Sequence, residues 1–470
     1  MSRLVVVSNR LPVVLEREEG GFTVCEGAGG LVTAMKPLLA RVGGAWIGFC
    51  GMCEDERDPR WREELARLGD GGVYYHPVIP SRRAYDAYYK QFANQDLWPR
   101  FHNMTHKMSR DASRHWPAYE AMNRTFAEQT CHVAEPGDMI WVQDYHLMLL
   151  PQILREEMPE CPIGHFLHIP FPPADVMCRQ PQAEEILAGV LGADLVGFHI
   201  PAYMENFIAA ADMIAGATLL SRTESEAVLE LNGREIRLGA FPIGINPSQL
   251  ERGADPAPVR RKLGAMADTL ILSMDRLDYT KAIPNRLEAY RMFLDKHPEY
   301  HEQVSLVQML DLSRKDIPAY GEEKAKVENG VSEIRDRYTS WQAIRLFAER
   351  WRRAQVAALM QMSKICIVTP RCDGMNLVAK EYVSAAPRDG VLVLSHQAGA
   401  AWQFAQHAVM VDGESPQSIV AGLRTALEMP LPDRRARMLE LKRNVHDQDV
   451  FWWADQFLGA LRPAESLAGD

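Results

Sequence analysis

Short runs of almost uninterrupted apolar residues recur along this chain, and longer segments with helical periodicity lie between them. A strand buried on both faces shows such a run, because neither face meets water. Strands of this kind separated by helices are typical of parallel sheets that are covered by helices. The expected strands are residues 4–7, 139–142, 163–168, 195–199, 269–274, 304–309, 365–368 and 391–394.

A passage rich in proline and glycine divides these expected strands into two groups. It comprises residues 241–247 and 253–258, and a helix is expected to resume near Val259. Proline and glycine interrupt regular structure, so this passage indicates a domain boundary. We therefore predict an α/β fold with two doubly wound, Rossmann-like domains, residues 1–246 and 247–446, that face each other across a cleft.

The composition excludes several classes of partner. The chain has 52 Lys and Arg against 62 Asp and Glu, a formal net charge of −10, so a broad nucleic-acid-binding face is not expected. No segment approaches the roughly 18–20 apolar residues of a membrane span, and the first residues lack the long apolar region of a signal peptide. We expect a cytoplasmic protein that acts on small molecules, with no nucleic-acid or membrane partner; whether it forms a homo-oligomer is left open.

In the N-terminal half, polar residues follow the expected strands. Arg10 follows the first strand, Asp144 follows the second, and His168 ends the third. The glycines of residues 27–30 precede a helical pattern over residues 31–39, where they can bring backbone N–H groups close to an anion. Because the carboxyl ends of parallel strands share one sheet edge, a ligand site is expected there. The alternatives are polar residues bonded to neighbouring backbone groups and a flexible glycine turn.

In the C-terminal half, two cations follow the strand at residues 269–274. Arg276 and Lys281 suit a diphosphate, since arginine offers a planar fork of donors and lysine a compact charge. Arg314, after the next strand, is a second candidate for binding an anion. The alternative is a solvated surface loop.

The segment that begins at Asp373 is the most specific. Asn376 can cap a helix that starts at about Leu377, and the unpaired N–H groups of that helix start, at Leu377 and Val378, would face an anion. Glu381, on the first turns of the helix, can accept two hydrogen bonds from a vicinal diol such as a ribose. A phosphate at the helix start with a carboxylate beyond it indicates a nucleotide-sugar site; the alternative is an ordinary capped helix.

Together these motifs resemble those of the trehalose-6-phosphate synthases, retaining glycosyltransferases of the glycosyltransferase-B fold. The similarity extends from Arg3 to about Leu461. It is carried by VVVSNR (5–10), Gly29-Gly30, Tyr88-Tyr89, Leu97-Trp98-Pro99, QDYHL (143–147), LHIPFP (167–172), RLDYTK (276–281), Ser313-Arg314 and DGMNLVAKEYV (373–383). By analogy with that fold, the C-terminal helix, residues 447–470, is expected to pack back on the N-terminal domain.

The resemblance implies site residues and no required metal ion or cofactor. The implied catalytic residues are Asp144, His168, Arg276, Lys281 and Asp373. The donor-binding residues are Gly29 and Gly30 on a mobile loop, Arg276 and Lys281 on the diphosphate, Asn376, Leu377 and Val378 at the helix start, and Glu381 on the ribose. The acceptor-binding residues are Arg10, Tyr89, Trp98, Asp144 and Arg314. Ala282 departs from the family, which usually has glycine there.

The leading hypothesis is transfer of glucose from UDP-glucose to glucose-6-phosphate, giving α,α-trehalose 6-phosphate. One alternative is the same chemistry with glycerol-3-phosphate and ADP- or UDP-glucose, because residues 199–207 resemble glucosylglycerol-phosphate synthases. Another is a catalytically silent regulator that binds sugar phosphate. A dinucleotide-dependent dehydrogenase is not expected, since no G-x-G-x-x-G opens a helix after a strand.

Overall fold

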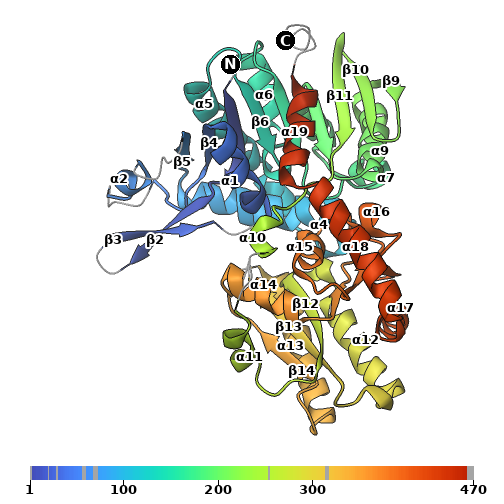
Figure 1. The fold of residues 1–470 in the computed structure, drawn as a ribbon. Coiled ribbons are helices and arrows are strands. Elements are labelled where there is room, and N and C mark those ends of the chain that lie inside the picture. The colour runs from blue at the N-terminus through green and yellow to red at the C-terminus, as the bar shows by residue number, and fades with distance from the viewer. Residues whose placement is uncertain are drawn as a thin grey trace. The chain divides into compact units, whose positions relative to one another are not determined.

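The chain forms two compact units. Unit 1 comprises Met1–Ile243 and Trp453–Asp470, and unit 2 comprises Gly244–Trp452. The computed structural model describes residues 3–18, 21–27, 30–54, 60–66, 72–251, 255–312 and 317–462 (Figure 1). The chain changes unit at residue 243 and again at 452, whereas the sequence predicts these boundaries at 246 and 446.

Unit 1 is built on a large mixed sheet. Its strands are β1 (Leu4–Arg10), β4 (Gly44–Phe49), β5 (Val73–Val78), β6 (Met139–Gln143), β7 (Ile163–Phe166), β8 (Leu195–Phe198), β9 (Thr218–Arg222), β10 (Glu226–Leu231) and β11 (Arg234–Ala240). They lie in the order β5-β4-β1-β6-β7-β8-β11-β10-β9. The strands from β5 to β11 in this order are parallel, and β10 and β9 are antiparallel at one edge. A separate hairpin pairs β2 (Val13–Glu18) with β3 (Gly21–Glu26).

Helices and short helical turns connect the strands of unit 1. They are α1 (Gly30–Val42), α2 (Arg60–Ala66), α3 (Arg82–Tyr85), η1 (Asp86–Leu97), α4 (Trp98–Phe101), η2 (Thr105–Lys107), η3 (Ala112–His115), α5 (Trp116–Val133), η4 (Tyr145–Leu147), α6 (Leu150–Glu157), α7 (Ala174–Met177), α8 (Ala183–Leu191), α9 (Pro201–Ala210) and η5 (Ala211–Ala215). Within the described residues, the last helix is α19 (Val450–Leu461).

From Trp453 onward α19 packs on the sheet of unit 1. Its Phe457 ring stacks on Trp141 of β6 with ring centroids 4.6 Å apart. Two glycines allow this approach, since a Cβ at Gly164 or at Gly197 would lie 2.8 Å or 2.7 Å from ring atoms of Phe457. Such contacts are shorter than carbon atoms tolerate, so the two glycines are needed for the close helix–sheet contact.

Unit 2 contains a second, smaller parallel sheet. Its strands are β12 (Thr269–Arg276), β13 (Val304–Asp311), β14 (Ile344–Phe347), β15 (Ile365–Val368), β16 (Val391–Ser395) and β17 (Val409–Val411), in the order β14-β13-β12-β15-β16-β17. Every neighbouring pair is parallel. The helices are α10 (Ser248–Glu251), α11 (Ala257–Leu263), η6 (Tyr279–Lys281), α12 (Ile283–Lys296), η7 (Pro298–Tyr300), α13 (Pro318–Arg337), α14 (Arg353–Met362), α15 (Leu377–Ala385), α16 (Ala401–Phe404), α17 (Pro416–Glu428) and α18 (Leu431–Asp447).

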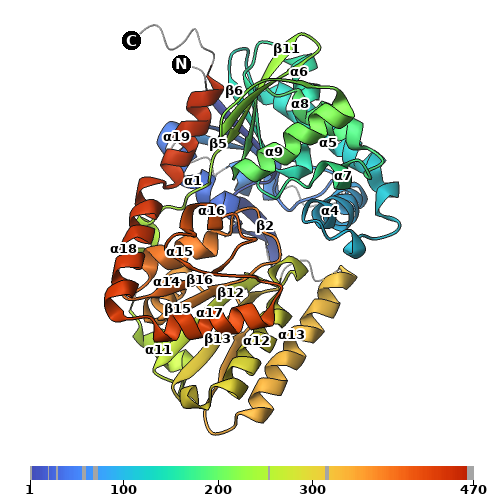
Figure 2. The same ribbon diagram turned by 90° about the vertical axis from the view of Figure 1, so that its right-hand side faces the viewer.

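Helices flank the sheet of unit 2 (Figure 2), and its core consists of buried side chains from both the strands and the helices. Leu287 of α12, Val331 of α13 and Leu423 of α17 belong to one buried cluster with residues of the strands. The helices α14 and α18 pack against α15, which contacts β15 and β16. Burial of an apolar side chain of this size contributes about 1.5–3 kcal/mol to the stability of the fold. Strands that are buried on both faces therefore consist almost entirely of apolar residues.

The predicted fold class of two doubly wound parallel sheets is confirmed, and all of the expected strands are present. The sequence analysis missed others, mainly at sheet edges. β5 is an edge strand that contains Pro77 and exposes Tyr74, so it lacks a continuous apolar run. β17 is only three residues long. Strands at edges escape the pattern because they are not buried on both faces. β4 was also missed although it is buried throughout and lies inside the sheet, because Gly44 and Gly48 interrupt its apolar run.

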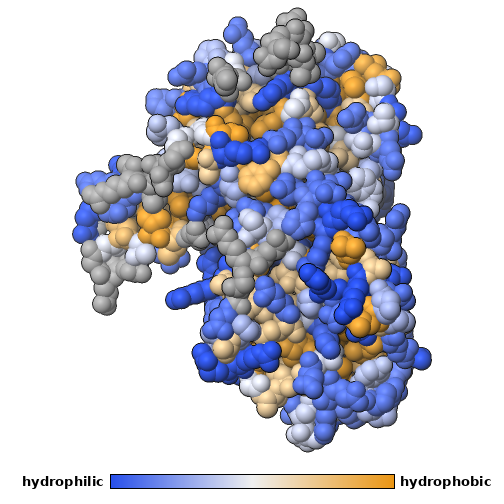
Figure 3. Space-filling model, in the orientation of Figure 1, coloured by the Kyte–Doolittle hydropathy of each residue, from blue (hydrophilic) through white to orange (hydrophobic). Residues whose placement is uncertain are grey.

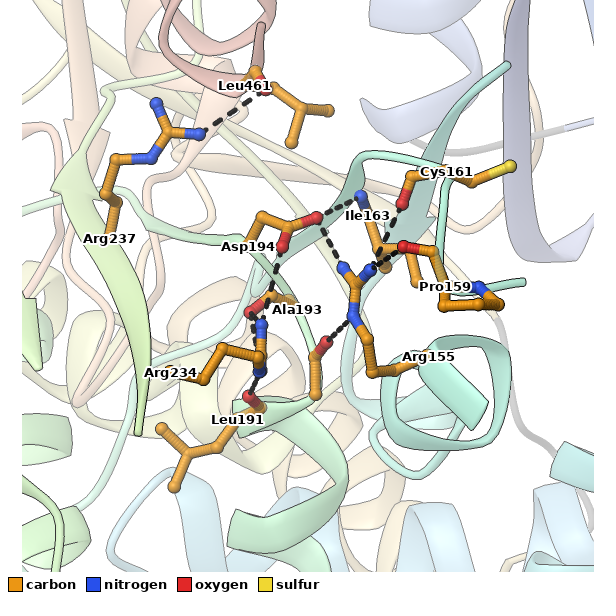
Figure 4. A network of polar contacts seen from close by, with 11 residues as sticks. Arg155, Pro159, Cys161, Ile163, Leu191, Ala193, Asp194, Arg234, Arg237 and Leu461 are labelled. Carbon is orange, nitrogen blue, oxygen red and sulfur yellow. Dashed lines mark hydrogen bonds and ion pairs between the residues drawn. The ribbon is translucent and has the colours of Figure 1, made fainter. Parts of the chain in front are cut away.

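A network of arginines surrounds Asp194, which precedes β8 at its amino end (Figure 4). The Asp194 carboxylate pairs with Arg155 of α6 and Arg234 of β11, and accepts a hydrogen bond of 2.8 Å from the N–H of Ile163. The carboxylate thus connects two strands and a helix. It lies at the amino ends of the parallel strands, away from the edge where ligands bind in such sheets.

The outer surface carries both polar and apolar side chains. Hydrophilic side chains and scattered apolar groups share the face drawn in Figure 3. Such scattered exposure is ordinary for globular proteins. None of the helices in the described part of the chain combines the length and the apolar character that crossing a bilayer requires.

Candidate functional site

In each unit the expected site residues lie where the order of the parallel strands reverses. In unit 1, β1 has β4 on one side and β6 on the other, and in unit 2, β12 has β13 on one side and β15 on the other. The carboxyl ends of such strands are where ligands bind in open α/β sheets. Arg10 ends β1 and Asp144 follows β6, whereas Arg276 ends β12 and Asp373 comes after β15.

Arg10 and Tyr89 meet in unit 1. The guanidinium carbon of Arg10 lies 5.0 Å from the centre of the Tyr89 ring, within the range of a cation–π contact. Tyr89 lies on η1, a π-helix, where Asn94 Nδ2 donates to the Tyr89 carbonyl at 2.7 Å. Its ring stacks on Tyr85 at 5.4 Å. Burial raises the pKa of Tyr85 to about 12, although the positive charge of Arg10 opposes the rise.

Asp144 has a strained backbone. Its φ of 72° and ψ of 172° lie in a region that residues other than glycine rarely enter, at a cost of about 1–3 kcal/mol. Two hydrogen bonds hold the conformation: the Asp144 N–H donates to the Phe166 carbonyl at 2.7 Å, and Asp144 Oδ1 accepts from the N–H of His168 at 3.1 Å. Strain of this kind concentrates at functional sites, which supports the prediction for this residue.

His146 links Tyr89 to Asp144, a role that the sequence analysis missed. Its ring stacks on Tyr89 with centroids 5.6 Å apart, and its Nδ1 lies 3.9 Å from Asp144 Oδ2. The available signal was its position two residues after Asp144. Trp98 lies beside the same segment, because its ring centroid is 5.7 Å from that of Tyr145.

His168 is held by Gln143, the last residue of β6. Its Nε2 lies 2.8 Å from Gln143 Oε1, and Gln143 Nε2 in turn donates to the Trp141 carbonyl at 3.5 Å. Burial lowers the pKa of His168 well below the usual 6.5, and the nearby histidines His199 and His165 lower it further. The neutral ring donates from Nε2 to the glutamine oxygen, which leaves Nδ1 as an acceptor.

In unit 2, Lys281, Asp373 and Asn376 form a connected group. Lys281 Nζ lies 2.5 Å from Asp373 Oδ2, and both side chains are largely buried, at 9% and 15% exposed. Asn376 Nδ2 donates to the same carboxylate oxygen at 2.9 Å. Asn376 also caps α15, since its side chain accepts from the N–H of Ala379 at 3.2 Å. The predicted cap and helix start are confirmed.

The start of α15 retains donors for a ligand. Leu377 and Val378 are the first two residues of α15. The N–H groups at the start of an α-helix have no carbonyl partner within that helix. Arg276 ends β12 with an exposed side chain. Lys281 is connected to this helix start through Asp373 and Asn376, and a helix start with a cation nearby favours an anion.

Glu381, one turn further along α15, faces Arg353 of α14. Their side chains approach to 3.7 Å, and that of Glu381 is 19% exposed. Burial raises the pKa of Glu381 above its usual 4.5, and the charge of Arg353 opposes the rise. The sequence analysis missed Arg353, because it lies among several arginines that no spacing distinguishes.

Two expected site residues, Gly29 and Arg314, lie outside the described residues. Gly30 begins α1. The other expected residues form one set in each unit: Arg10, Tyr89, Trp98, Asp144 and His168 in unit 1, and Arg276, Lys281, Asp373, Asn376, Leu377, Val378 and Glu381 in unit 2. Over the ranges that the structure describes, no three His, Cys, Asp or Glu side chains are grouped so that they could hold a metal ion.

Comparison with known proteins gives concordant matches along the chain. The sequence model of the family described as glycosyltransferase family 20 matches residues 2–463. The trehalose-6-phosphate synthase of Mycobacterium bovis is 37% identical, with 98% of this chain and 95% of that protein covered. The UDP-forming α,α-trehalose-phosphate synthase of Schizosaccharomyces pombe is 34% identical, with 98% of this chain and 90% of that protein covered.

Solved structures agree with these matches. The α,α-trehalose-phosphate synthase of Burkholderia xenovorans, crystallised with glucose-6-phosphate, has a TM-score of 0.86 and 32% identity, and the match covers 98% of this chain and 100% of that one. An E. coli structure described as bound with UDP-2-fluoro glucose has a TM-score of 0.86 and 30% identity, with 98% and 99% covered. Both show the glycosyltransferase-B fold of two Rossmann-like domains.

Proposed function

Because the chain belongs to glycosyltransferase family 20, we propose that it transfers glucose from UDP-glucose to glucose-6-phosphate and so forms α,α-trehalose 6-phosphate. The observation that carries this proposal is the start of α15, where an asparagine-capped helix, the Lys281–Asp373 pair and Glu381 lie together. The names of the relatives and the ligands of two similar structures support the choice of substrates.

Unit 2 is proposed to bind the donor. Arg276 and Lys281 hold the diphosphate, together with the N–H groups at the start of α15, because this combination offers both full and partial positive charge to an anion. The Glu381 carboxylate accepts the two ribose hydroxyls. Asp373 contacts hydroxyls of the donor glucose, and its bond to Asn376 fixes the carboxylate for that contact.

Unit 1 is proposed to bind the acceptor and to contact the donor sugar. Arg10 binds the acceptor phosphate, while Tyr89 and Trp98 contact the sugar ring. Arg314, which belongs to unit 2, is proposed as a second ligand of the acceptor phosphate. Asp144 lies near the acceptor hydroxyl, where its strained backbone fixes the carboxylate. His168 contacts the donor glucose through its ring, whose orientation Gln143 fixes. Gly29 and Gly30, the latter at the start of α1, are proposed to bind the donor.

The reaction proceeds by charge separation at the anomeric carbon. Breaking the bond between that carbon and the phosphate oxygen places negative charge on the nucleoside diphosphate and positive charge on the ring. Arg276, Lys281 and the start of α15 stabilise the former, an electrostatic contribution that is already oriented before reaction. The acceptor hydroxyl attacks from the same face, and its proton passes to the departing phosphate oxygen, so configuration is retained.

No metal ion or other cofactor is proposed, since these cationic groups supply the positive charge that the leaving group needs. Activity should therefore survive treatment with EDTA. A loss of activity that added Mg²⁺ restores would contradict this part of the proposal.

One assay tests the substrates. The purified chain is given UDP-, ADP- or GDP-glucose with either glucose-6-phosphate or glycerol-3-phosphate, and the product is identified by mass. Trehalose 6-phosphate from UDP-glucose is expected. Transfer to glycerol-3-phosphate alone would assign the alternative activity, and no transfer with retained binding would indicate the silent regulator.

A single substitution tests the acceptor pocket. Arg314→Ala should raise the KM for glucose-6-phosphate far more than that for the donor, because it removes a charge that pairs with the acceptor phosphate. An unchanged acceptor KM would remove Arg314 from the pocket.

A further inference from the structure

Arg286, on the first turn of α12, is an arginine with 0% exposure that none of the roles above uses. Its N–H groups reach Thr369 Oγ1 at 2.9 Å, Gln308 Oε1 at 3.4 Å and the carbonyl oxygen of Lys281 at 3.3 Å. They also donate to Ser273 Oγ and pair with Asp275 Oδ2. A buried cation is costly unless it is paired and hydrogen-bonded, and this one meets both conditions.

Apart from the Lys281 carbonyl, the acceptors lie on or directly after three neighbouring strands of unit 2. Ser273 and Asp275 lie on β12, Gln308 lies on β13, and Thr369 directly follows β15. In the sheet β12 lies between β13 and β15. Arg286 therefore connects both sides of the point at which the strand order reverses.

The same guanidinium contacts the segment that carries the two proposed diphosphate ligands. Asp275 immediately precedes Arg276, and because side chains alternate along a strand, the inward carboxylate directs Arg276 to the other face. The bond to the Lys281 carbonyl restrains the end of η6. That turn is also restrained from its start, where the Lys281 N–H donates to the Asp278 carbonyl at 3.0 Å.

We propose that Arg286 is a positioning residue that fixes Arg276 and Lys281 for the diphosphate, an inference that rests on the proposed donor site. Cations that are held in place before the ligand arrives lose little freedom on binding, which strengthens binding. Asp275 neutralises the charge of Arg286, so the pair adds little positive charge to the diphosphate site. It affects Arg276 and Lys281 by fixing the backbone that carries them.

The main test is the double variant Asp275→Asn, Arg286→Met. It removes both buried charges together, because removing one alone would leave the other unpaired. UDP binding to the whole chain is measured by titration calorimetry, with thermal melting in parallel. We expect the Kd for UDP to rise about tenfold or more and the donor KM to rise with it, while the acceptor KM stays unchanged.

A second variant covers the case in which the double variant does not fold. Arg286→Lys keeps the positive charge beside Asp275 but lacks the fork that reaches Thr369 and the Lys281 carbonyl at once. It should weaken UDP binding in the same direction. A folded variant of either kind that binds UDP within twofold of the unaltered chain would overturn the inference.

A matched control separates positioning from general stability. Asp194→Asn weakens a comparable arginine network at the amino ends of the strands of unit 1. It should lower the melting temperature and leave the Kd for UDP unchanged. If Arg276→Ala and Lys281→Ala weaken UDP binding but the Arg286 variants do not, only this inference fails; if none of them does, the proposed donor site fails as well.

Discussion

The strained backbone of Asp144 allows a test in which two substitutions differ only in their tolerance of that backbone. Asp144→Ala and Asp144→Gly both remove the carboxylate and its bond to the His168 N–H. Such a bond to a charged acceptor contributes about 1.5–3 kcal/mol, so each variant loses this amount. Alanine keeps the strain at φ 72° and ψ 172°, whereas glycine adopts this conformation freely.

The difference between the two variants can be worked out. Relief of strain favours the glycine variant by about 1–3 kcal/mol. The greater freedom of glycine in the unfolded chain takes back about 0.5–1 kcal/mol. The glycine variant should therefore be more stable than the alanine variant by up to about 2.5 kcal/mol, although both should be inactive.

Urea unfolding measures this difference, with the midpoint compared at constant slope. The same pair of substitutions at Asp138 is the control. Asp138 also accepts a backbone hydrogen bond, from the N–H of Arg3, but it is not among the described residues with positive φ. There the alanine variant should be the more stable. Asp144→Gly no more stable than Asp144→Ala would refute the assignment of strain.

Three further predictions concern unit 2. Asn376→Ala should cost about 0.5–2 kcal/mol for the lost cap, and Asn376→Gly clearly less because φ is 77°; equal melting temperatures would contradict this. Ala282→Gly should be neutral or stabilising by up to about 1 kcal/mol, because an alanine at φ 51° is strained, and a fall in melting temperature would argue against strain. Since burial raises the pKa of Glu381, acidification should raise the donor KM at a pH above the ordinary carboxyl range, and Glu381→Gln should abolish that dependence. Acidification should have the opposite effect on stability. Folding favours the protonated Glu381 carboxyl, so the stabilisation that this group contributes is present at low pH and is lost as the pH rises through the raised pKa.

The sequence predicted best those features that appear as a pattern of neighbouring residues in the chain. Strands at the centre of both sheets are apolar on both faces and were found, as was the cap at Asn376, because a cap depends on neighbours in the chain. The arginines that pair across elements were not found. Arg286 contacts residues on or directly after three strands, and nothing near it in sequence distinguishes it from a surface arginine.

The sequence analysis also did not predict which residues have unusual backbone angles. Asp144 has positive φ although it is not glycine, and only the surrounding structure imposes that conformation. Ala282 also has positive φ, and there the glycine that is usual in the family was the available signal. His146 could have been anticipated from its place beside Asp144. Its contact with Tyr89 on a separate helix could not, because it depends on the folding of distant segments together.

The position of α19 affects the order in which the two units complete their folding during synthesis. The surface around Gly164 and Gly197 is covered by Phe457, which is translated after all of unit 2. While the ribosome is still making residues 244–452, this surface lacks its cover and remains available to chaperones or to other nascent chains. We therefore expect unit 1, although begun first, to be completed last, and a chain that stops before Trp453 to aggregate even when unit 2 has folded.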